Sequence, residues 1–483
     1  MVGSQMFRRT MPVLLLTSLG FLLRIFNIGV QGFWYDEAYT LFIARLPLIE
    51  ALRALVADGV HPPLFYLIQR VTLIFGKSEA VFRLPSMIFG VLAIPFLYWL
   101  VVEWVDDHAG FLAGLLLALS PFHIWYSQEA RMYTLLLMMV VVCMFAYRMM
   151  LRGQGLVYHV VFIAASTILY LTHYFGLMLP LIQLTHLGFH IRRYPRLLRV
   201  WVVEQTLAII PFLGWVYTLA QRPGQSFGIG WIAAPQWRDL GYTLINLIVG
   251  YTRPLTLFHW FGLGVSILLV VLGVRCSWRW PEGRILTIIW AFLPMVLIFM
   301  LSFSRPTYVD RFFIISLPAL LMLIVAGVVS LGQRRAITFA VVLVLLFTIG
   351  ISKFSFGNDQ QKEEWREAAA YITKAHLNET IVIRVLQMVV PLSYYYEGPL
   401  RLEAMEVNRQ ITPLAELARG HSGLWLLYWN AMSDPHLVTA NPPFDPSSEV
   451  DPVAADWIAG RGPVILEQKD FRGVTVFHFQ LHP

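Results

Sequence analysis

The chain has 483 residues, of which 58% are hydrophobic and only 13% are charged, and its formal net charge is +7. Soluble domains contain about a quarter charged residues, so this composition excludes an ordinary soluble enzyme. The Lys and Arg residues cluster in short loops between apolar runs, where orientation in a membrane explains them, and we expect no nucleic-acid binding. Cys143 and Cys276 provide neither a disulfide framework nor a thiolate metal site.

Apolar runs of roughly 20 residues recur from Met11 to Ile351, and each is long enough to cross a bilayer core about 30 Å thick. The first run lacks a small-residue cleavage site, so we interpret it as a retained helix. The sequence predicts an all-α polytopic membrane protein with about eleven spans. They lie near residues 11–29, 79–102, 109–125, 130–149, 156–172, 175–191, 200–220, 257–274, 285–303, 311–331 and 336–352.

The positions of the basic loops predict the topology. Arg8 and Arg9 precede the first span, which places the N-terminus in the cytoplasm and the following loop outside the cell membrane. The number of membrane crossings must leave the later basic loops in the cytoplasm. Segment 61–76, which contains Gln69 and Arg70, is therefore expected not to cross the membrane. We expect it to be a partly embedded helix on the outer side.

Three segments are expected outside the membrane. Residues 30–78 form a first loop, in which 38–57 has the spacing of an interfacial helix. Residues 222–256 form a second loop, with turn residues Pro223, Gly224, Gly228, Gly230 and Pro235 and with Trp231 and Trp237 suited to the headgroup zone. Residues 353–483 follow the transmembrane domain 1–352 and form a small extracytoplasmic α/β domain. Its predicted elements are a helix at 363–375, strands near 380–385, 424–429, 464–467 and 475–480, and a hairpin turn at Gly473.

An acidic pair, Asp36 and Glu37, directly follows the first span at the start of a predicted helix. A carboxylate there can simply cap the helix, because the first turn has free N–H groups. The neighbours Trp34 and Tyr35 place the pair at the membrane surface, and acids are rare elsewhere in the apolar region. We therefore favour a catalytic carboxylate at Asp36.

A second cluster on the same side consists of Glu129, Arg131 and Tyr133, in the short loop that opens the fourth span. The helical spacing of Glu129 and Tyr133 places them on one face. The alternative is an interfacial ion pair with Tyr133 as a membrane-belt residue. The short loop keeps Glu129 close to the bundle, where its carboxylate can orient an acceptor or assist Asp36.

Four further residues suit an anion. Arg305 and Arg311 flank an outer turn, and Arg is suited to bidentate phosphate contact, although lipid headgroups are the alternative partner. His61 begins a helix that carries Pro62 and Pro63 in its first turn, and His173 lies at another outer end; a packing role is the alternative for both. No His, Glu or Cys spacing resembles a zinc ligand set, and we expect no metal.

These segments together resemble a known family. The motifs are WYDEAY at 34–39, HPPLFY at 61–66, RLPS at 83–86, SPFHIWYSQEARMY at 120–133, VDRFFIISLP at 309–318 and KEEWREAAAYI at 362–372. Their order is similar to that in the family 39-type integral-membrane glycosyltransferases, which include protein O-mannosyltransferases and bacterial aminoarabinose transferases.

The resemblance implies the GT-C fold and an inverting transfer of a sugar from a polyprenyl-phosphate donor to a protein, lipid or glycan acceptor at the outer face. It implies that Asp36 is the general base and that Glu129 occupies the second acidic position. The aminoarabinose transferases have Lys where this chain has His61, so a phosphate contact there would depend on a weaker, pH-sensitive charge. The residues predicted to bind substrate are Glu37, His61, Arg131, Tyr133, His173, Arg305 and Arg311.

Two other functions stay open at this stage. Eleven spans with charged residues suit a transporter or lipid flippase, although transporters place such groups near the midplane, often in two related halves. A non-catalytic protein that recruits a glycan-assembly machine is the third possibility. A separate hypothesis is that a divalent ion bridges Asp36 and Glu129.

Overall fold

A computed structural model describes residues 2–221, 232, 234–251, 255–276, 278–356, 362–373, 379–385, 388–398, 402–407, 410–411, 414–417, 419–429 and 464–480. The chain divides into two compact units. Unit 1 consists of Met1–Ile28 and Ile43–Gly357, and unit 2 consists of Gly29–Phe42 and Asn358–Pro483. Sequence reasoning did not anticipate that a segment from the first outer loop belongs with the C-terminal part.

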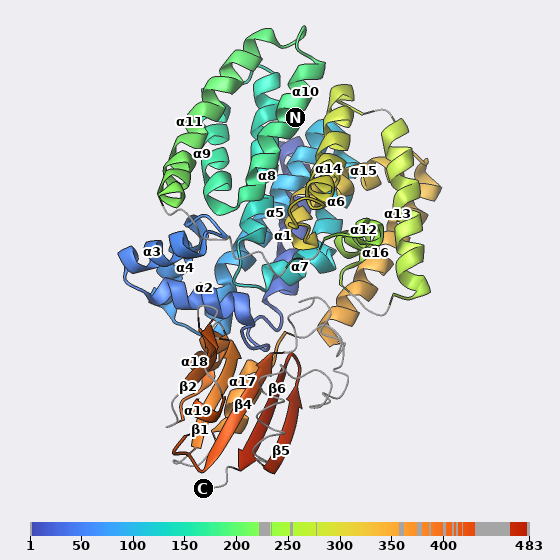
Figure 1. The fold of residues 1–483 in the computed structure, drawn as a ribbon. Coiled ribbons are helices and arrows are strands. Elements are labelled where there is room, and N and C mark those ends of the chain that lie inside the picture. The colour runs from blue at the N-terminus through green and yellow to red at the C-terminus, as the bar shows by residue number, and fades with distance from the viewer. Residues whose placement is uncertain are drawn as a thin grey trace. The chain divides into compact units, whose positions relative to one another are not determined.

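Unit 1 is helical throughout its described residues (Figure 1). Its first half contains α1 (Val2–Ile25), α3 (Leu48–Asp58), α4 (Leu64–Thr72), η1 (Leu73–Phe75), α5 (Glu79–Trp104), α6 (Asp107–Leu119), α7 (Pro121–Ser127), α8 (Tyr133–Leu151) and α9 (Leu156–Thr172). Its second half contains η2 (Tyr174–Leu177), α10 (Met178–Phe189), α11 (Pro195–Ala220), α12 (Trp237–Val249), α13 (Leu257–Arg275), α14 (Pro281–Leu301), η3 (Asp310–Ser316), α15 (Leu317–Val329) and α16 (Gln333–Phe356).

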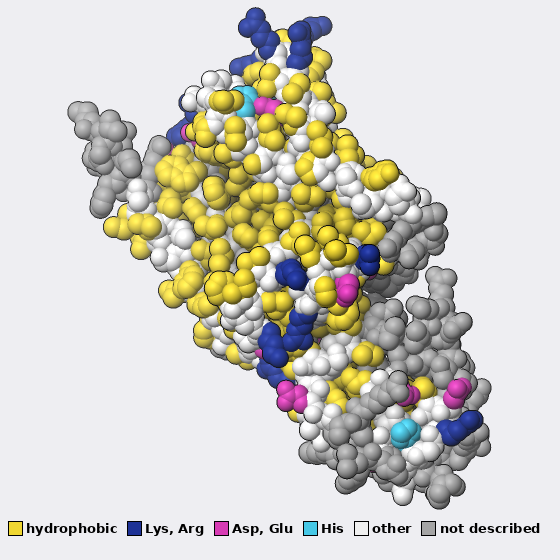
Figure 2. All heavy atoms as spheres, turned by 90° about the vertical axis from the view of Figure 1, so that its left-hand side faces the viewer, with side chains coloured by type: hydrophobic (Ala, Val, Ile, Leu, Met, Phe, Trp, Pro, Cys, Tyr) yellow, Lys and Arg dark blue, Asp and Glu magenta, His cyan; other side chains and the backbone are white. Residues whose placement is uncertain are grey.

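The lengths and compositions of these helices are those of a multi-pass membrane protein. Among the described residues, seven helical segments are long and apolar enough to cross a membrane, or eight if α6 and α7, which bend by 56°, form one span. Shorter apolar helices cover Thr10–Ile25, Leu64–Phe75, Leu156–Thr172 and Tyr174–Phe189. The count of eleven spans therefore stays a prediction. Figure 2 shows a broad apolar surface on unit 1, with Lys and Arg at the top of the view and further basic side chains below the apolar region.

Proline changes two predicted helices. The predicted interfacial helix 38–57 is wrong as a single element, because α2 (Tyr35–Arg45) ends before Pro47 and α3 begins after it. The prediction that His61 begins a helix is also wrong. The helix α4 begins at Leu64, with Pro63 at its N-cap, so His61 lies in the preceding turn. Proline has no N–H group and restricts the residue before it, which favours such boundaries.

The core of unit 1 lies where helices approach closely. A Cβ atom added to Gly273 in α13 would meet the carbonyl oxygen of Leu323 at 2.0 Å, and one added to Gly327 in α15 would meet that of Leu269 at 2.0 Å. Only glycine permits this contact between the two backbones. Small residues commonly allow such packing between membrane helices.

The described residues of unit 2 form a six-stranded sheet with strand order β3-β2-β1-β4-β6-β5. Strand β1 (Glu379–Val385) pairs in parallel with β2 (Leu402–Val407) and β4 (Gly423–Trp429). The remaining pairings, which involve β3 (Gln410–Ile411), β5 (Val464–Phe471) and β6 (Val474–Gln480), are antiparallel. The described helices of unit 2 are the first part of α2 (Tyr35–Arg45), α17 (Trp365–Ile372), α18 (Val389–Tyr395) and α19 (Leu414–Leu417). Buried residues of α17, including Trp365 and Ile372, join Trp425 and Val476 of the sheet in one core.

The predicted elements of the C-terminal part largely correspond to this sheet. The four predicted strands lie on β1, β4, β5 and β6, and Gly473 turns the last hairpin with φ +72°. Helix α17 covers most of the predicted helix, whose end at Ala375 lies outside the described residues. The predictions for Pro223, Gly224, Gly228, Gly230 and Trp231 also lie outside them, whereas Trp237 is 72% exposed and begins the unpredicted helix α12.

Candidate functional site

Unit 1 brings together three of the predicted substrate-binding residues at the ends of its helices. Arg131 lies in the turn before α8, His61 in the turn before α4, and His173 between α9 and η2. An Nη2 atom of Arg131 lies 3.3 Å from Nε2 of His61, and the rings of His61 and His173 meet edge to face at 5.4 Å. All three side chains are at most 7% exposed. They form a compact buried group from segments distant in sequence.

Two more predicted residues belong to this group. Tyr133, the first residue of α8, packs its ring 6.1 Å from that of His173. Arg311 is the second residue of η3, and its side chain is 6% exposed. Its positive charge acts on both His61 and His173. We call the set of His61, Arg131, Tyr133, His173 and Arg311 the arginine cluster.

The arginine cluster is cationic because of its arginines rather than its histidines. Burial, followed by the positive charge of Arg131, lowers the pKa of His61 well below 6.5. The same two causes lower the pKa of His173 to about 3. Both imidazoles are therefore neutral at pH 7, and the two guanidinium groups supply the charge. The phosphate contact at His61 stays a prediction, and at pH 7 the structure offers a neutral imidazole beside Arg131 for it.

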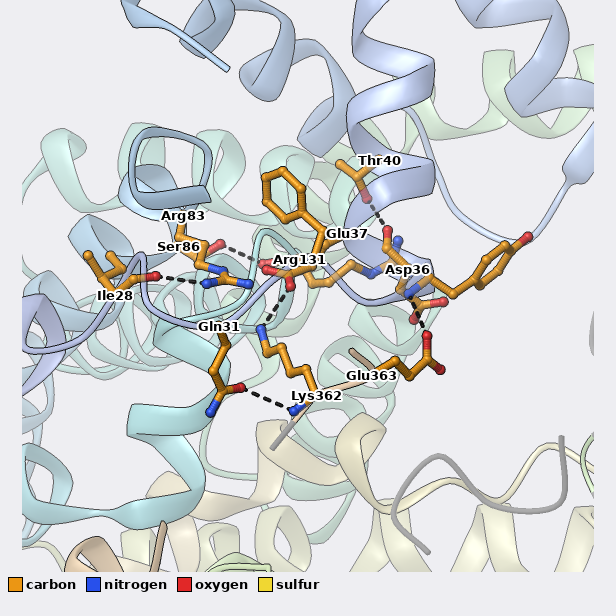
Figure 3. Close-up of polar contacts among 12 residues, drawn as sticks. Ile28, Gln31, Asp36, Glu37, Thr40, Arg83, Ser86, Arg131, Lys362 and Glu363 are labelled. Carbon is orange, nitrogen blue, oxygen red and sulfur yellow. Dashed lines mark hydrogen bonds and ion pairs between the residues drawn. The ribbon is translucent and has the colours of Figure 1, made fainter. Parts of the chain in front are cut away.

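The turn that contains Glu129 and Arg131 is fixed by its neighbours in the bundle. The backbone N–H of Arg131 donates to the Glu129 carbonyl at 2.8 Å, and Ser86 of α5 donates from Oγ to the Arg131 carbonyl at 2.9 Å (Figure 3). On the other side of the turn, Gln128 donates from Nε2 to the carbonyl of Phe26 at 2.6 Å. Glu129 is 1% exposed. The turn therefore holds a carboxylate and a guanidinium in a buried, preorganised position.

The acidic pair lies in unit 2, in the first turn of α2. Thr40 donates from Oγ1 to the Asp36 carbonyl at 2.7 Å, and the side chain of Asp36 is partly exposed. Glu37 is fully buried and forms an ion pair with Lys362, whose Nζ lies 2.9 Å from Oε2 (Figure 3). The N–H of Lys362 donates to Oε1 of Gln31 at 3.2 Å. Asp36 is thus partly exposed, whereas the carboxylate of Glu37 is buried beside a lysine.

A second buried acid, Glu363, supports the same segment. Its carboxylate accepts hydrogen bonds from Nε1 of Trp365 and, at 2.7 Å, from Nε1 of Trp429. It also accepts from the backbone N–H of Tyr35 at 3.3 Å. Burial raises the pKa of Glu363 to about 7 despite these hydrogen bonds, and the charge of Asp36 acts in the same direction. Glu363 therefore ties the residue before Asp36 to the core of unit 2.

The structure gives different surroundings to the two arginines that were each predicted to suit a phosphate. Arg305 is exposed in the turn after α14, whereas Arg311 is buried in the arginine cluster. Sequence reasoning gave no role to Asp310, whose carboxylate accepts from Nδ2 of Asn246 at 2.6 Å and from Oη of Tyr251 at 3.0 Å. Its place in the VDRFF motif was the available signal. Asp310 anchors the start of η3 and thereby positions the neighbouring Arg311.

Sequence reasoning also gave no role to Lys362 and Glu363, although both open the KEEWR motif. Glu37 and its partner Lys362 are 325 positions apart in the sequence, so no local pattern connects them. The local signal was that charged residues, Lys362 and Glu363, reappear in the sequence soon after the last apolar run.

Comparison with known proteins identifies the fold. Residues 60–217 match the family of dolichyl-phosphate-mannose-protein mannosyltransferases. The crystal structure of ArnT from Cupriavidus metallidurans bound to undecaprenyl phosphate aligns over 96% of this chain and 97% of that one, with a TM-score of 0.61 and 14% identity. The chain has the GT-C glycosyltransferase fold. No curated protein matches it by sequence.

Archaeal oligosaccharyltransferases have a similar GT-C fold. The structure of the Archaeoglobus fulgidus enzyme in complex with Zn and sulfate covers 86% of this chain and 67% of its own, with a TM-score of 0.57 and 13% identity. The structure of the oligosaccharyltransferase AglB from Archaeoglobus fulgidus, in complex with an inhibitory peptide and a dolichol-phosphate, gives a TM-score of 0.56 at 12% identity, over 87% of this chain and 69% of that one. Together with the family match, these likenesses confirm the predicted class, a multi-pass membrane glycosyltransferase.

Proposed function

We propose that this GT-C glycosyltransferase transfers a sugar from a polyprenyl-phosphate donor to an acceptor hydroxyl, with inversion, at the extracytoplasmic face of the cell membrane. The observation that carries the proposal is the arginine cluster, in which Arg131 and Arg311 are buried beside two neutral imidazoles. A buried pair of guanidinium groups favours an anion with several oxygens, such as a phosphate. The undecaprenyl phosphate and dolichol-phosphate bound in two similar structures support a lipid-phosphate donor.

In the proposed reaction, Asp36 removes the proton from the acceptor hydroxyl as its oxygen attacks the anomeric carbon. The bond between that carbon and the phosphate oxygen breaks, and its electron pair remains on the departing polyprenyl phosphate. Attack from the side opposite the phosphate inverts the configuration. Arg131 and Arg311 stabilise the charge that develops on the leaving phosphate. Glu129, held in the same turn as Arg131, orients the acceptor or assists Asp36.

The proposed orientation places the N-terminus in the cytoplasm and unit 2 outside the membrane. It follows from the basic residues near this turn. Arg192 and Arg193 lie in the turn between α10 and α11, Arg196 and Arg199 lie near the start of α11, and all four are exposed. A protein, a lipid or a cell-envelope glycan would then be the acceptor.

The test incubates the purified protein in lipid with a panel of polyprenyl-phosphate sugars and measures release of polyprenyl phosphate. We expect Asp36→Asn to lower turnover by at least about a hundredfold, the usual effect of losing an acid-base group. The matched control is Glu50→Gln, which alters an exposed acid of α3. Near-normal turnover of a folded Asp36→Asn protein would refute the role of Asp36.

The hypothesis of a divalent ion between Asp36 and Glu129 has its own test. Turnover is measured in excess chelator and after addition of Mg²⁺ or Mn²⁺, which carboxylates bind well. Unchanged turnover in excess chelator would refute the hypothesis of a bound ion and leave the proposed acid-base reaction intact.

A further inference from the structure

A group of potential metal ligands lies in unit 1 near the turn that joins α10 and α11. His186 is in the last turn of α10, His190 caps that helix, and Glu282 is in the first turn of α14. One ligand atom from each side chain lies within 4.8 Å of the other two. His186 is fully buried, and Glu282 is 9% exposed. The spacing His186–Leu187–Gly188–Phe189–His190 places two imidazoles on one helix face, a relation that the sequence analysis overlooked.

The hydrogen bonds of the two histidines favour coordination through Nε2. Nδ1 of His186 lies 2.9 Å from Oη of Tyr147, and Nδ1 of His190 lies 3.0 Å from the carbonyl oxygen of His186. A metal-bound histidine usually donates its other ring N–H to an oxygen in this way. Within the described part of the chain, the buried Nε2 of His186 has no hydrogen-bond partner. A buried polar atom without a partner is costly, and a metal ion would satisfy it.

The existing partners of Glu282 define what competes with a metal ion. Oη of Tyr194 donates to Oε2 at 2.6 Å, and Arg193 forms an ion pair through Oε1. Each carboxylate oxygen has a second lone pair, so Glu282 can keep Tyr194 and still bind an ion. Arg193 is 69% exposed and competes only weakly.

From this arrangement we infer that His186, His190 and Glu282 form a binding site for a divalent transition-metal ion of the zinc type. Two imidazoles and a carboxylate are a known set of three protein ligands for zinc, with water in the fourth position. In tetrahedral coordination the ligand atoms lie about 3.4 Å apart. Rotations of these side chains, at the end of α10 and the start of α14, would bring the ligand atoms from their present separations to this distance.

The inferred site is independent of the proposed sugar transfer. His186 is 13 positions beyond His173 of the arginine cluster, which corresponds to about 20 Å along a helix. A bound ion would join α10 to α14 at the end of unit 1 that carries the basic turn. It would stabilise the packing of these helices without contacting the proposed phosphate site.

The test uses the full-length protein in lipid, with any affinity tag removed because polyhistidine binds the same ions. The protein is dialysed against buffered free Zn²⁺, and the bound metal is measured by mass spectrometry. We expect about one zinc ion per chain, and its loss in His186→Ala and His190→Ala. The matched control is His108→Ala, which removes an exposed histidine at the start of α6 and should leave binding unchanged.

A second variant keeps the test decisive if a histidine variant fails to fold. Arg193→Gln removes an exposed competing cation and should tighten zinc binding by up to about fivefold, which corresponds to roughly 1 kcal/mol for an exposed ion pair. Absence of bound zinc in the wild type would overturn the inference. Retention of zinc by the His186→Ala protein would also overturn it. A third contrary result would be an unchanged zinc affinity in Arg193→Gln together with retention of zinc in Glu282→Gln.

Discussion

The ion pair between Lys362 and Glu37 allows a quantitative test of how unit 2 holds the segment that contains Asp36. Nζ of Lys362 and Oε2 of Glu37 are 2.9 Å apart, and the two side chains are 6% and 0% exposed. The perturbation is Lys362→Met, which keeps most of the aliphatic stem and removes the ammonium group. The carboxylate of Glu37 then stays buried without the lysine charge.

The expected magnitude follows from burial. Removing one partner of a buried ion pair costs about 3–5 kcal/mol, since the remaining charge is already desolvated and loses this interaction. The same substitution in an exposed pair costs about 0–1 kcal/mol. The pair of Arg152 and Glu103 is the matched exposed case, with side chains 45% and 27% exposed. Lys362→Met should therefore be several times more destabilising than Arg152→Met.

The assay is thermal unfolding of the full protein in lipid or detergent, followed by tryptophan fluorescence. Unit 2 has suitable probes in Trp365 and Trp429, which belong to or pack against its core. We also expect the double variant Glu37→Gln/Lys362→Met to recover part of the lost stability, because it removes both buried charges. Equal melting temperatures for Lys362→Met and Arg152→Met would refute the reasoning.

Further predictions concern three other positions. Glu363 has a pKa of about 7 in the folded state against 4.5 in its ordinary state, so its contribution to stability is fully present below pH 4.5 and is lost as the pH rises to 7. This loss is about 3 kcal/mol, and melting curves of Glu363→Gln should lack it. Gly327→Ala should destabilise the protein by about 1–3 kcal/mol, because its Cβ would overlap the α13 backbone, whereas Gly264→Ala, in open space on α13, should not lower the melting temperature. Under the proposed function, Arg311→Ala should raise the donor KM more than it lowers kcat, and the exposed Arg305→Ala should change KM less; equal effects in kinetic assays would contradict the phosphate role.

Local pattern was sufficient for much of the fold. Long apolar runs indicated a multi-pass helical protein, and short β-rich runs such as 424–429 indicated strands, because both signals extend over neighbouring residues. Proline boundaries were less well predicted. Residues 38–57 keep a helical apolar spacing on both sides of Pro47, so periodicity alone did not reveal the break between α2 and α3.

Burial of the charged side chains could not be predicted from the sequence. Arg305 and Arg311 have the same side chain and lie six positions apart, yet one is exposed and the other is buried. The difference arises because η3 packs inside the bundle, whereas Arg305 lies in a surface turn. Likewise, the pKa of His61 is lowered first by burial and then by the positive charge of Arg131, which comes from another segment.

The sequence by itself determined that this is a polytopic membrane protein with a C-terminal α/β part, and its ordered motifs indicated the glycosyltransferase class. These properties depend on composition and on residues near one another in the chain. Only the tertiary structure decided that Gly29–Phe42 belongs with the C-terminal unit and that Lys362 neutralises Glu37. It alone brought Glu282 to His186 and His190. Such contacts join residues up to hundreds of positions apart, and they exist only once the helices and the sheet have packed.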